Sequence, residues 1–243
     1  MHPLLFRIGN FEITSFGAML AVATIVGLLI LQREARRTNL PESVLDAGLM
    51  GVIGGLIGAK VFWTVEHAST APISDLLFSR GGLSWYGGLI GGIGSGLVLI
   101  WVRRWPLMAI LAAATPALAF GQFLGRIGCF LVGDDYGWPT SLPWGVAFPE
   151  GLPPTTVPVH PTQLYEAVGL GIIGALLIHW RRAGVSDGAV LGRYLVMVAA
   201  LRFAIEFVRV HDAIALGLAP AHWLSILVAM IGIGVLRQAK KSS

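Results

Sequence analysis

The clearest pattern along the chain is a series of long apolar runs, each bounded by charged residues or proline. A run of about 20 apolar residues is long enough for a helix to cross the hydrocarbon core of a bilayer. The pattern therefore predicts an all-α, polytopic membrane protein with seven transmembrane helices. We expect these helices at Ser15–Gln32, Val44–Val65, Ser84–Val102, Pro106–Phe123, Thr162–His179, Val190–Val208 and Pro220–Leu236.

Composition agrees with this interpretation, because 55% of the residues are hydrophobic and only 12% are charged. A soluble domain carries about 25% charged residues. The first apolar run is longer than the core of a signal peptide, so we expect it to be retained. The single cysteine, Cys129, has no partner for an internal disulfide and gives no indication of the redox compartment.

Glycine is concentrated in the second and third expected spans, at Gly51–Gly58 and Gly87–Gly96. Small residues four apart let helices pack closely in lipid, and helix packing is the interpretation that we favour. A dinucleotide-binding loop is excluded, because no strand precedes either run.

Basic residues are concentrated in alternate connections between the expected spans. The positive-inside rule then places the amino terminus outside and the carboxyl terminus in the cytoplasm. The residues on the expected cytoplasmic side are Arg33, Arg36, Arg37, Arg103, Arg104, Arg181, Arg182, Arg193, Arg237, Lys240 and Lys241. The remaining basic residues are Arg7, Lys60, Arg80, Arg126, Arg202 and Arg209. An anionic ligand on the outer side would explain why several of these lie at or near that face.

The segment Gly125–Gly137 places an arginine and two adjacent acids among four glycines, directly after an apolar run. The planar guanidinium of Arg126 is suited to binding phosphate, and a charged segment at the edge of a span indicates a functional site. The alternative is that Arg126 only anchors a helix end at the lipid headgroups. Residues 124–161 form the longest polar segment, which we expect to face outward and to be functional.

Two further segments of the chain carry clusters of polar residues. His160–Glu166 places histidine, glutamine, tyrosine and glutamate at the start of the fifth span. In the sixth span, Arg202 and Glu206 are four residues apart, on one helix face and close enough to pair. This pair is either a structural clasp between helices or, as we prefer, a polar wall of the cavity that Arg126 faces.

Four segments together resemble the prolipoprotein diacylglyceryl transferase family of bacterial inner membranes. They are Gly81–Gly88 (GGLSWYGG), Gly125–Gly137 (GRIGCFLVGDDYG), His160–Glu166 (HPTQLYE) and Leu201–Arg209 (LRFAIEFVR). The family also has seven spans with the amino terminus outside, so the resemblance covers nearly the whole chain. The chain departs from the family pattern at Cys129 and Val132 (usually asparagine), Asp134 (glutamate), Tyr86 (often histidine) and Lys60 (commonly arginine).

The resemblance implies a single transferase domain over residues 1–243 in the inner membrane, with its active site facing the periplasm. The implied reaction transfers the diacylglyceryl group of phosphatidylglycerol to the lipobox cysteine thiol of a preprolipoprotein, and it releases glycerol phosphate. This is the first step of bacterial lipoprotein maturation. The implied partners are phosphatidylglycerol, lipobox signal peptides and membrane lipids, with no nucleic acid and no cofactor.

The resemblance also implies roles for individual residues. Arg126 and Arg202 would clamp the phosphodiester and its leaving group. Tyr86 or His160 would orient or deprotonate the thiol, and Glu206 would orient Arg202. The residues expected to shape the headgroup site are Asp134, Gly137, Gln163, Tyr165 and Arg209. None of the six histidines forms an HExxH or paired pattern, so we expect no metal site.

Another class of function stays open on sequence alone. A non-catalytic, phospholipid-binding or lipid-moving relative would keep the phosphate clamp and lose the chemistry, and the residues at Cys129 and Val132 favour it. Cys129 itself is flanked by apolar residues, so we expect an inert thiol rather than an enzyme nucleophile. A generic transporter is disfavoured, because no pair of spans shows the corresponding breaks of an inverted repeat.

Overall fold

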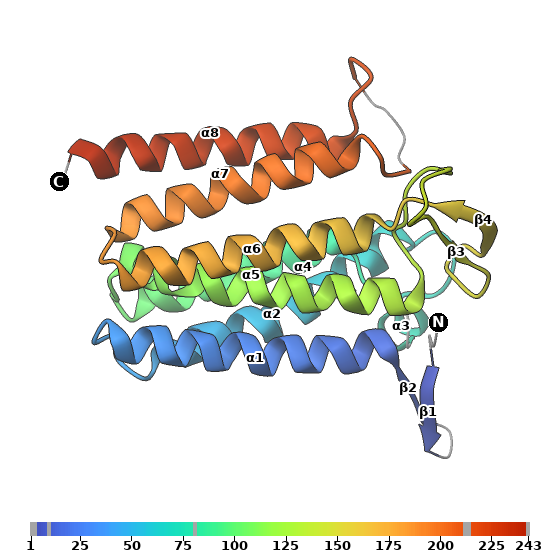
Figure 1. The fold of residues 1–243 in the computed structure, drawn as a ribbon. Coiled ribbons are helices and arrows are strands. Elements are labelled where there is room, and N and C mark those ends of the chain that lie inside the picture. The colour runs from blue at the N-terminus through green and yellow to red at the C-terminus, as the bar shows by residue number, and fades with distance from the viewer. Residues whose placement is uncertain (1–3, 9–10, 80–81, 211–214, 242–243) are drawn as a thin grey trace. The chain divides into compact units, whose positions relative to one another are not determined.

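The computed structural model describes residues 4–8, 11–79, 82–210 and 215–241. Within these residues, seven helices are long and apolar enough to cross a membrane, which confirms the predicted all-α membrane fold. Arg80 and Gly81, which belong to the predictions above, lie outside the described residues. The spanning helices are α1 (Ser15–Arg37), α2 (Val44–Glu66), α4 (Trp85–Val102), α5 (Leu107–Val132), α6 (Thr162–Arg182), α7 (Asp187–Glu206) and α8 (Pro220–Lys241) (Figure 1).

One short helix and two hairpins complete the described chain. α3 (Ile73–Phe78) is a helix of six residues. β1 (Leu4–Ile8) and β2 (Phe11–Thr14) form one antiparallel hairpin, and β3 (Val146–Phe148) and β4 (Thr155–Val159) form another. These hairpins were not predicted from the sequence, because strands of three to five residues carry too little alternation to be recognised.

Helix α5 departs most from its predicted bounds. The sequence predicts an end at Phe123, but the helix continues to Val132, because apolar residues persist among the glycines after Phe123. It ends where Gly133 adopts a φ of 78° and donates its amide to the carbonyl of Cys129. Glycine at this position is a common helix stop, since it adopts left-handed φ without a steric penalty. Arg126 therefore lies in the last two turns of a helix, and the polar segment begins at Gly133.

A second correction concerns Arg193, which was grouped with the basic residues of the connections although the predicted span Val190–Val208 already contains it. The residue lies in the second turn of α7, and its guanidinium stacks over the ring of Trp180 with 4.6 Å between the carbon Cζ and the ring centroid. A long arginine side chain at a helix end can keep its charged head in the interface. Helix α7 starts at Asp187, three residues before the predicted Val190.

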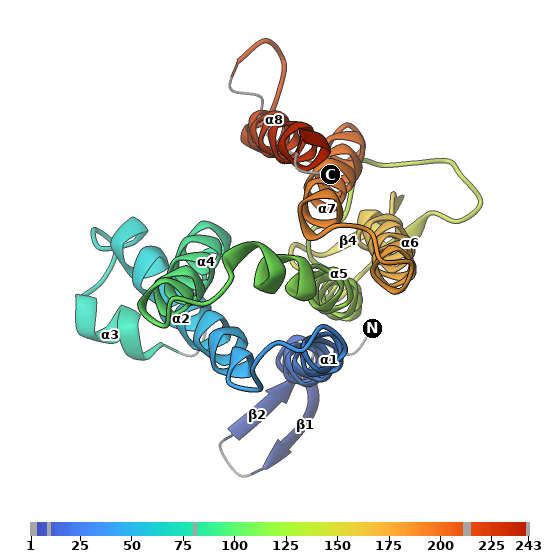
Figure 2. The same ribbon diagram turned by 90° about the vertical axis from the view of Figure 1, so that its left-hand side faces the viewer.

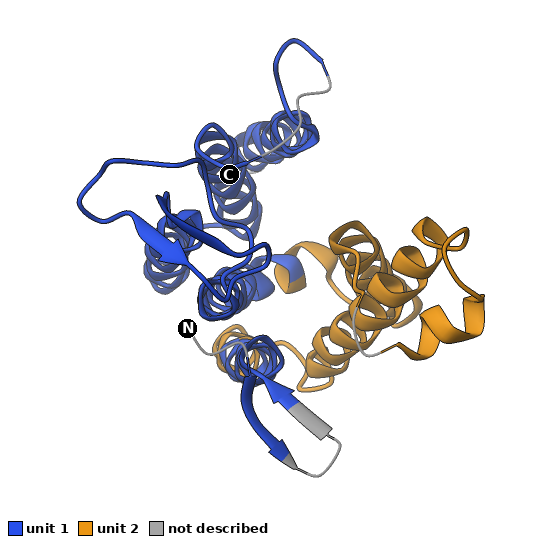
Figure 3. Ribbon diagram, turned by 90° about the vertical axis from the view of Figure 1, so that its right-hand side faces the viewer, with its two compact units in different colours: residues 1–30, 111–243 blue, residues 31–110 orange. Residues whose placement is uncertain are grey.

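The chain forms two compact units, which are coloured separately in Figure 3. Unit 2 comprises Leu31–Ile110 and is built on α2 and α4, which lie side by side (Figure 2). Their contact is made through glycine. A methyl group on Gly58 would lie 2.4 Å from the carbonyl oxygen of Gly87, and one on Gly91 would lie 2.3 Å from the carbonyl oxygen of Gly54. These distances confirm that the glycines serve close helix packing.

Unit 1 comprises Met1–Ile30 and Leu111–Ser243. Its buried core joins α5, α6 and α7 through the residues Ala112, Ala119, Ile173, Leu177, Val190 and Tyr194. Gln122 of α5 donates a hydrogen bond of 3.0 Å to the hydroxyl of Tyr194, which satisfies two polar groups inside the bundle. The end of α5, the start of α6 and the end of α7 meet beside β3 and β4 (Figure 1). Three of the four motifs, Gly125–Gly137, His160–Glu166 and Leu201–Arg209, lie at this end of unit 1.

Candidate functional site

The site is built on Arg126, which projects from the next-to-last turn of α5. Its Nε atom lies 3.0 Å from Oε2 of Glu166 in the first turns of α6, and its Nη1 atom lies 2.9 Å from Oδ2 of Asp135. The Arg126 side chain is 16% exposed and that of Glu166 is 9% exposed. Arg126 is therefore a largely buried cation held by two carboxylates from different segments of the chain.

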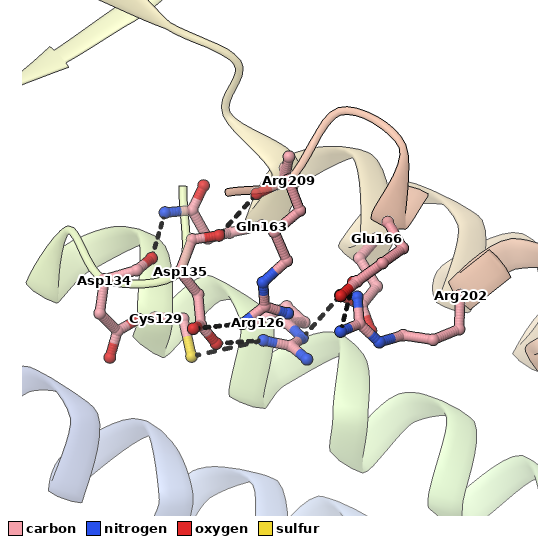
Figure 4. A network of polar contacts seen from close by, with 10 residues as sticks. Arg126, Cys129, Asp134, Asp135, Gln163, Glu166, Arg202 and Arg209 are labelled. Carbon is pink, nitrogen blue, oxygen red and sulfur yellow. Dashed lines mark hydrogen bonds and ion pairs between the residues drawn. The ribbon is translucent and has the colours of Figure 1, made fainter. Parts of the chain in front are cut away.

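Asp135 joins Arg126 to a second arginine. The second carboxylate oxygen of Asp135 forms an ion pair with Nη2 of Arg209, which follows the end of α7. Asp135 has a φ of 60°, a left-handed conformation that aspartate adopts more easily than most residues. Its backbone carbonyl accepts a hydrogen bond of 2.6 Å from the hydroxyl of Thr162. One carboxylate thus bridges two guanidiniums, each bound to a separate oxygen (Figure 4).

Arg202 lies on the last turns of α7, where its Nη2 atom is 2.7 Å from Oε2 of Glu206. This ion pair confirms the prediction that residues four apart on this helix can meet. The charge of Glu166 also acts on the Arg202 guanidinium. The Nη1 atom of Arg202 is buried and has no hydrogen-bond partner among the described residues. A guanidinium that keeps the two N–H groups of one Nη atom unpaired at a polar site is suited to receiving an anion.

The two adjacent acids, Asp134 and Asp135, have opposite environments. The Asp134 side chain is directed away from Arg126, whereas that of Asp135 points toward it (Figure 4). Burial, together with the neighbouring charge of Asp135, raises the pKa of Asp134 above its ordinary value. Burial would also raise the pKa of Asp135, but Arg209 and Arg126 outweigh it and hold that pKa below the ordinary value. The two arginines therefore favour the charged form of Asp135.

Similarity to known proteins agrees with the motifs that meet here. A family model described as prolipoprotein diacylglyceryl transferase matches residues 3–237. The chain belongs to the prolipoprotein diacylglyceryl transferase family. It is 29% identical over 240 residues to the Clostridium tetani phosphatidylglycerol–prolipoprotein diacylglyceryl transferase, covering 97% of this chain and 96% of that relative. Proteins of the same name from Idiomarina loihiensis and Nitratidesulfovibrio vulgaris are 34% identical over 200 residues (80% of this chain, 74% of the relative) and 32% identical over 251 residues (97% and 92%).

As a member of this transferase family, the chain is a multi-pass membrane enzyme, and its remaining predicted site residues fall into two groups. Gln163 is fully buried, and its amide nitrogen donates to the backbone carbonyl of Asp134. Gly137 has no space beside it, since a methyl group there would lie 2.1 Å from the carbonyl oxygen of Val208. Both residues hold the loop after α5 against its neighbours.

His160 and Tyr165 form a separate polar cluster at the same end of unit 1. The Nδ1 atom of His160 lies 3.3 Å from the hydroxyl oxygen of Tyr165. That hydroxyl also accepts a hydrogen bond of 2.8 Å from the indole nitrogen of Trp144. The imidazole is half-buried and in contact with a group that can orient it. Tyr86 belongs to unit 2, where it is half-exposed at the start of α4 with its ring edge-on to Trp85.

Asp135 and Glu166 received no site role from the sequence of this transferase, although both contact Arg126. The motifs contained both residues. Sequence alone could not show which of two adjacent acids turns toward the arginines, because a single change of φ reverses the direction of a side chain. For Glu166 the signal was its place at the end of HPTQLYE, three residues after Gln163 and on the same helical face.

Cys129, Asp134 and Asp135 have potential metal-ligand atoms within 4.8 Å of one another, in the part of the chain that the structure describes. The Cys129 thiol is buried and lies 4.0 Å from Nη1 of Arg126. Two arginines already neutralise Asp135, so the local charge disfavours a cation. The same arrangement of guanidiniums favours an anionic ligand.

Proposed function

We propose that this protein transfers the diacylglyceryl group of phosphatidylglycerol to the lipobox cysteine thiol of a preprolipoprotein. The observation that carries the proposal is the meeting of three guanidiniums at one end of unit 1, with Nη1 of Arg202 buried and unpaired among the described residues. The substrates named for the relatives, phosphatidylglycerol and a prolipoprotein, supply the anionic lipid and the thiol that this site requires.

In the proposed reaction, the thiolate sulfur attacks the glyceryl carbon that carries the phosphate ester. A carbon–sulfur bond forms as the carbon–oxygen bond breaks, and the electron pair leaves with the oxygen of glycerol phosphate. Arg126 and Arg202 bind the phosphate oxygens, where negative charge increases as the leaving group departs. Removing one such donor from a preorganised site typically lowers the rate by about 100-fold to 1000-fold. Glu206 holds the Arg202 guanidinium from the same helix.

The thiol proton requires an acceptor, and His160 and Tyr86 are the proposed candidates. An ordinary thiol has a pKa of about 8.5, so only a small fraction is thiolate at neutral pH. An imidazole titrates near pH 6.5 and a phenol near pH 10, which makes histidine the better base at neutral pH. His160 is also held by Tyr165. We therefore assign the base role to His160 and an orienting role toward the thiol to Tyr86.

The remaining assignments concern the headgroup and the membrane. Arg209 contributes a third cation, while Asp134, Gly137, Gln163 and Tyr165 shape the loop and wall around it. The last turns of α6 and α8 carry Arg181, Arg182, Lys240 and Lys241. The site lies at the opposite end of these helices, so the positive-inside rule supports a site that faces the periplasm. We place the protein accordingly in the bacterial inner membrane.

The test is transfer of labelled diacylglyceryl from phosphatidylglycerol to a lipobox peptide by the purified protein. We expect a thioether-linked product from the natural protein and a loss of at least about 100-fold in Arg126→Ala and Arg202→Ala. Arg36→Ala is the matched control, because Arg36 pairs with Glu42 in an exposed ion pair. Binding of phosphatidylglycerol without any thioether product would contradict the transferase proposal and support a non-catalytic lipid-binding relative.

A further inference from the structure

Asp135 occupies the position between Arg126 and Arg209 where an anion would be expected to bind. Each of its two oxygens contacts a different guanidinium, and both arginine side chains are only 16% exposed. A phosphodiester likewise presents two anionic oxygens on one central atom. The carboxylate and the phosphodiester can therefore satisfy the same two arginines in the same manner, but not at the same time.

We propose that the Asp135 carboxylate is an internal substitute for the lipid phosphate. Before lipid binds, Asp135 holds Arg126 and Arg209 in place, and the anionic headgroup displaces it on binding. Asp135 is then a specificity-determining residue, because a ligand must compete with it. A neutral or zwitterionic headgroup competes poorly for two guanidiniums, whereas a phosphatidylglycerol headgroup competes well. This inference rests on the proposed function, since it takes phosphatidylglycerol as the ligand that enters.

Three features of the site make Asp135, rather than Glu166, the group that moves. The Asp135 side chain is 40% exposed, whereas that of Glu166 is 9% exposed and packed at the start of a helix. Asp135 belongs to the segment between α5 and β3, so its carboxylate can turn into solvent by rotation about its side-chain bonds. If Glu166 left Arg126, its charged carboxylate would have to enter the apolar helix bundle, which is costly. Glu166 therefore stays bound to Arg126 while the partner on Nη1 is exchanged.

The backbone around Asp135 does not need to move in this exchange. Thr162 donates to the carbonyl of Asp135, and the amide of Leu152 donates to the carbonyl of Gly133 at 2.9 Å. Gly137 donates its amide to the carbonyl of His160 at 2.9 Å. These bonds hold the loop on both sides of Asp135. Only the side chain exchanges, and the two arginines stay where the phosphate will need them.

The test compares the natural protein with Asp135→Asn in detergent micelles, with short-chain phosphatidylglycerol as the probe and phosphatidylcholine as the neutral reference. Binding is followed by calorimetry, and the KM for phosphatidylglycerol is measured in the transfer assay. Asparagine tolerates the left-handed φ of 60° and removes only the charge. We expect Asp135→Asn to bind phosphatidylglycerol at least about fivefold more tightly, with KM lowered to match and kcat changed less than about twofold. Asp135→Gly, which also suits that φ, is expected to do the same.

Two control variants separate the charge from the loop. Glu150→Gln removes an exposed acid of the same polar segment and is expected to leave binding unchanged. Thr162→Val removes the hydrogen bond to the Asp135 carbonyl but keeps the carboxylate, so it loosens the loop without removing the competitor. The proposal is overturned if Asp135→Asn binds phosphatidylglycerol equally or more weakly, if Thr162→Val tightens binding as much, or if neither the natural protein nor Asp135→Asn binds it.

The two proposals fail in different ways. If the natural protein yields no thioether product while Asp135→Asn still binds phosphatidylglycerol more tightly, the transferase proposal fails and the competition by Asp135 stands. If transfer proceeds with the same KM and the same affinity in both proteins, the transferase stands and the competition is refuted. A separate arm with free glycerol phosphate shows whether the headgroup alone displaces the carboxylate or whether the lipid chains are needed.

Discussion

The guanidinium of Arg126 and the carboxylate of Glu166 lie 3.0 Å apart, and this buried pair joins the end of α5 to the start of α6. Each side chain would be costly to bury alone, so the pair ties the position of the proposed phosphate-binding arginine to the polar turn that begins α6. Arg126 keeps Asp135 as a second partner, so losing Glu166 weakens the arrangement without leaving the arginine unpaired.

Glu166→Gln is therefore expected to lower both stability and activity. The loss of a charge-assisted hydrogen bond typically costs about 1.5–3 kcal/mol. We expect the melting temperature in detergent to fall and kcat/KM for phosphatidylglycerol to drop at least about tenfold. Glu42→Gln removes the partner of Arg36 in an exposed pair and should change stability by less than about 1 kcal/mol. Equal melting temperatures for Glu166→Gln and the natural protein would contradict the structural role of the pair.

Replacing the acids after α5 should have opposite effects on the pH dependence of stability. Asp135 has a pKa below the ordinary carboxylate value of about 3.9, so its ion pairs stabilise the fold above that pH and are lost as the pH falls through the lowered pKa. Asp135→Asn is expected to lower the melting temperature at pH 7. The difference from the natural protein should shrink only when the solution becomes more acidic than the ordinary carboxylate pKa.

Asp134 has a raised pKa, so its ionised form is disfavoured in the folded state at neutral pH. Asp134→Asn removes that charge and should raise the melting temperature at pH 7. The gain is expected to shrink as the pH falls through the raised pKa and to disappear below the ordinary carboxylate value of about 3.9, where the folded and unfolded states both bind the proton. Melting temperatures of the natural protein and both variants, measured from pH 7 to well below the ordinary carboxylate value of about 3.9, test both effects. Parallel curves for Asp134→Asn and Asp135→Asn would show that the two acids share one environment.

His160→Gln is expected to reduce kcat by at least about 100-fold, the usual contribution of a general base. Tyr86→Phe should reduce kcat less, because a residue that only orients the thiol does not accept its proton. The transfer assay with phosphatidylglycerol and a lipobox peptide measures kcat for both variants. His179→Gln changes an exposed histidine in the last turn of α6 and serves as the control. The reverse ranking would assign the base role to Tyr86.

The glycine contact in unit 2 yields a prediction that is independent of the site. A methyl group on Gly58 would lie 2.4 Å from the carbonyl oxygen of Gly87, whereas one on Gly94 has nothing within 4 Å. Gly58→Ala is expected to destabilise the protein by about 1–3 kcal/mol, the usual cost of overpacking. Gly94→Ala should be neutral or slightly stabilising, because alanine favours the helix by up to about 1 kcal/mol. Thermal unfolding of the two variants in detergent makes the comparison.

The sequence predicts the membrane fold well, because a chain segment that crosses the hydrocarbon core must satisfy its backbone hydrogen bonds internally. Each such segment therefore forms a long apolar helix, which is easily recognised. It predicts the pairing of Arg202 with Glu206 for a similar reason, since four residues of helix fix their separation. The end of α5 was harder to locate. Arginine and glycine suggest a loop at Gly125–Gly128, but the apolar residues that follow keep the helix continuous to Val132.

The contacts between distant segments could not be read from the chain in the same way. Arg126 meets Glu166, and Arg209 meets Asp135, across segments whose separation depends on how α5, α6 and α7 pack. The direction of Asp135 depends on a left-handed φ, which sequence patterns rarely reveal. The motifs indicated an arginine-rich site. The structure adds which carboxylate faces each arginine.

The glycine contact between α2 and α4 also divides unit 2 into positions that accept a bulky group and positions that do not. Ile57 and Ile90 are 59% and 65% exposed on the same two helices, so they face away from the contact. A spin label or fluorophore can be carried at these positions without separating the backbones, whereas a label on Gly58 or Gly91 would force them apart. Movements of this helix pair during turnover can consequently be followed by spectroscopy from its outer surface.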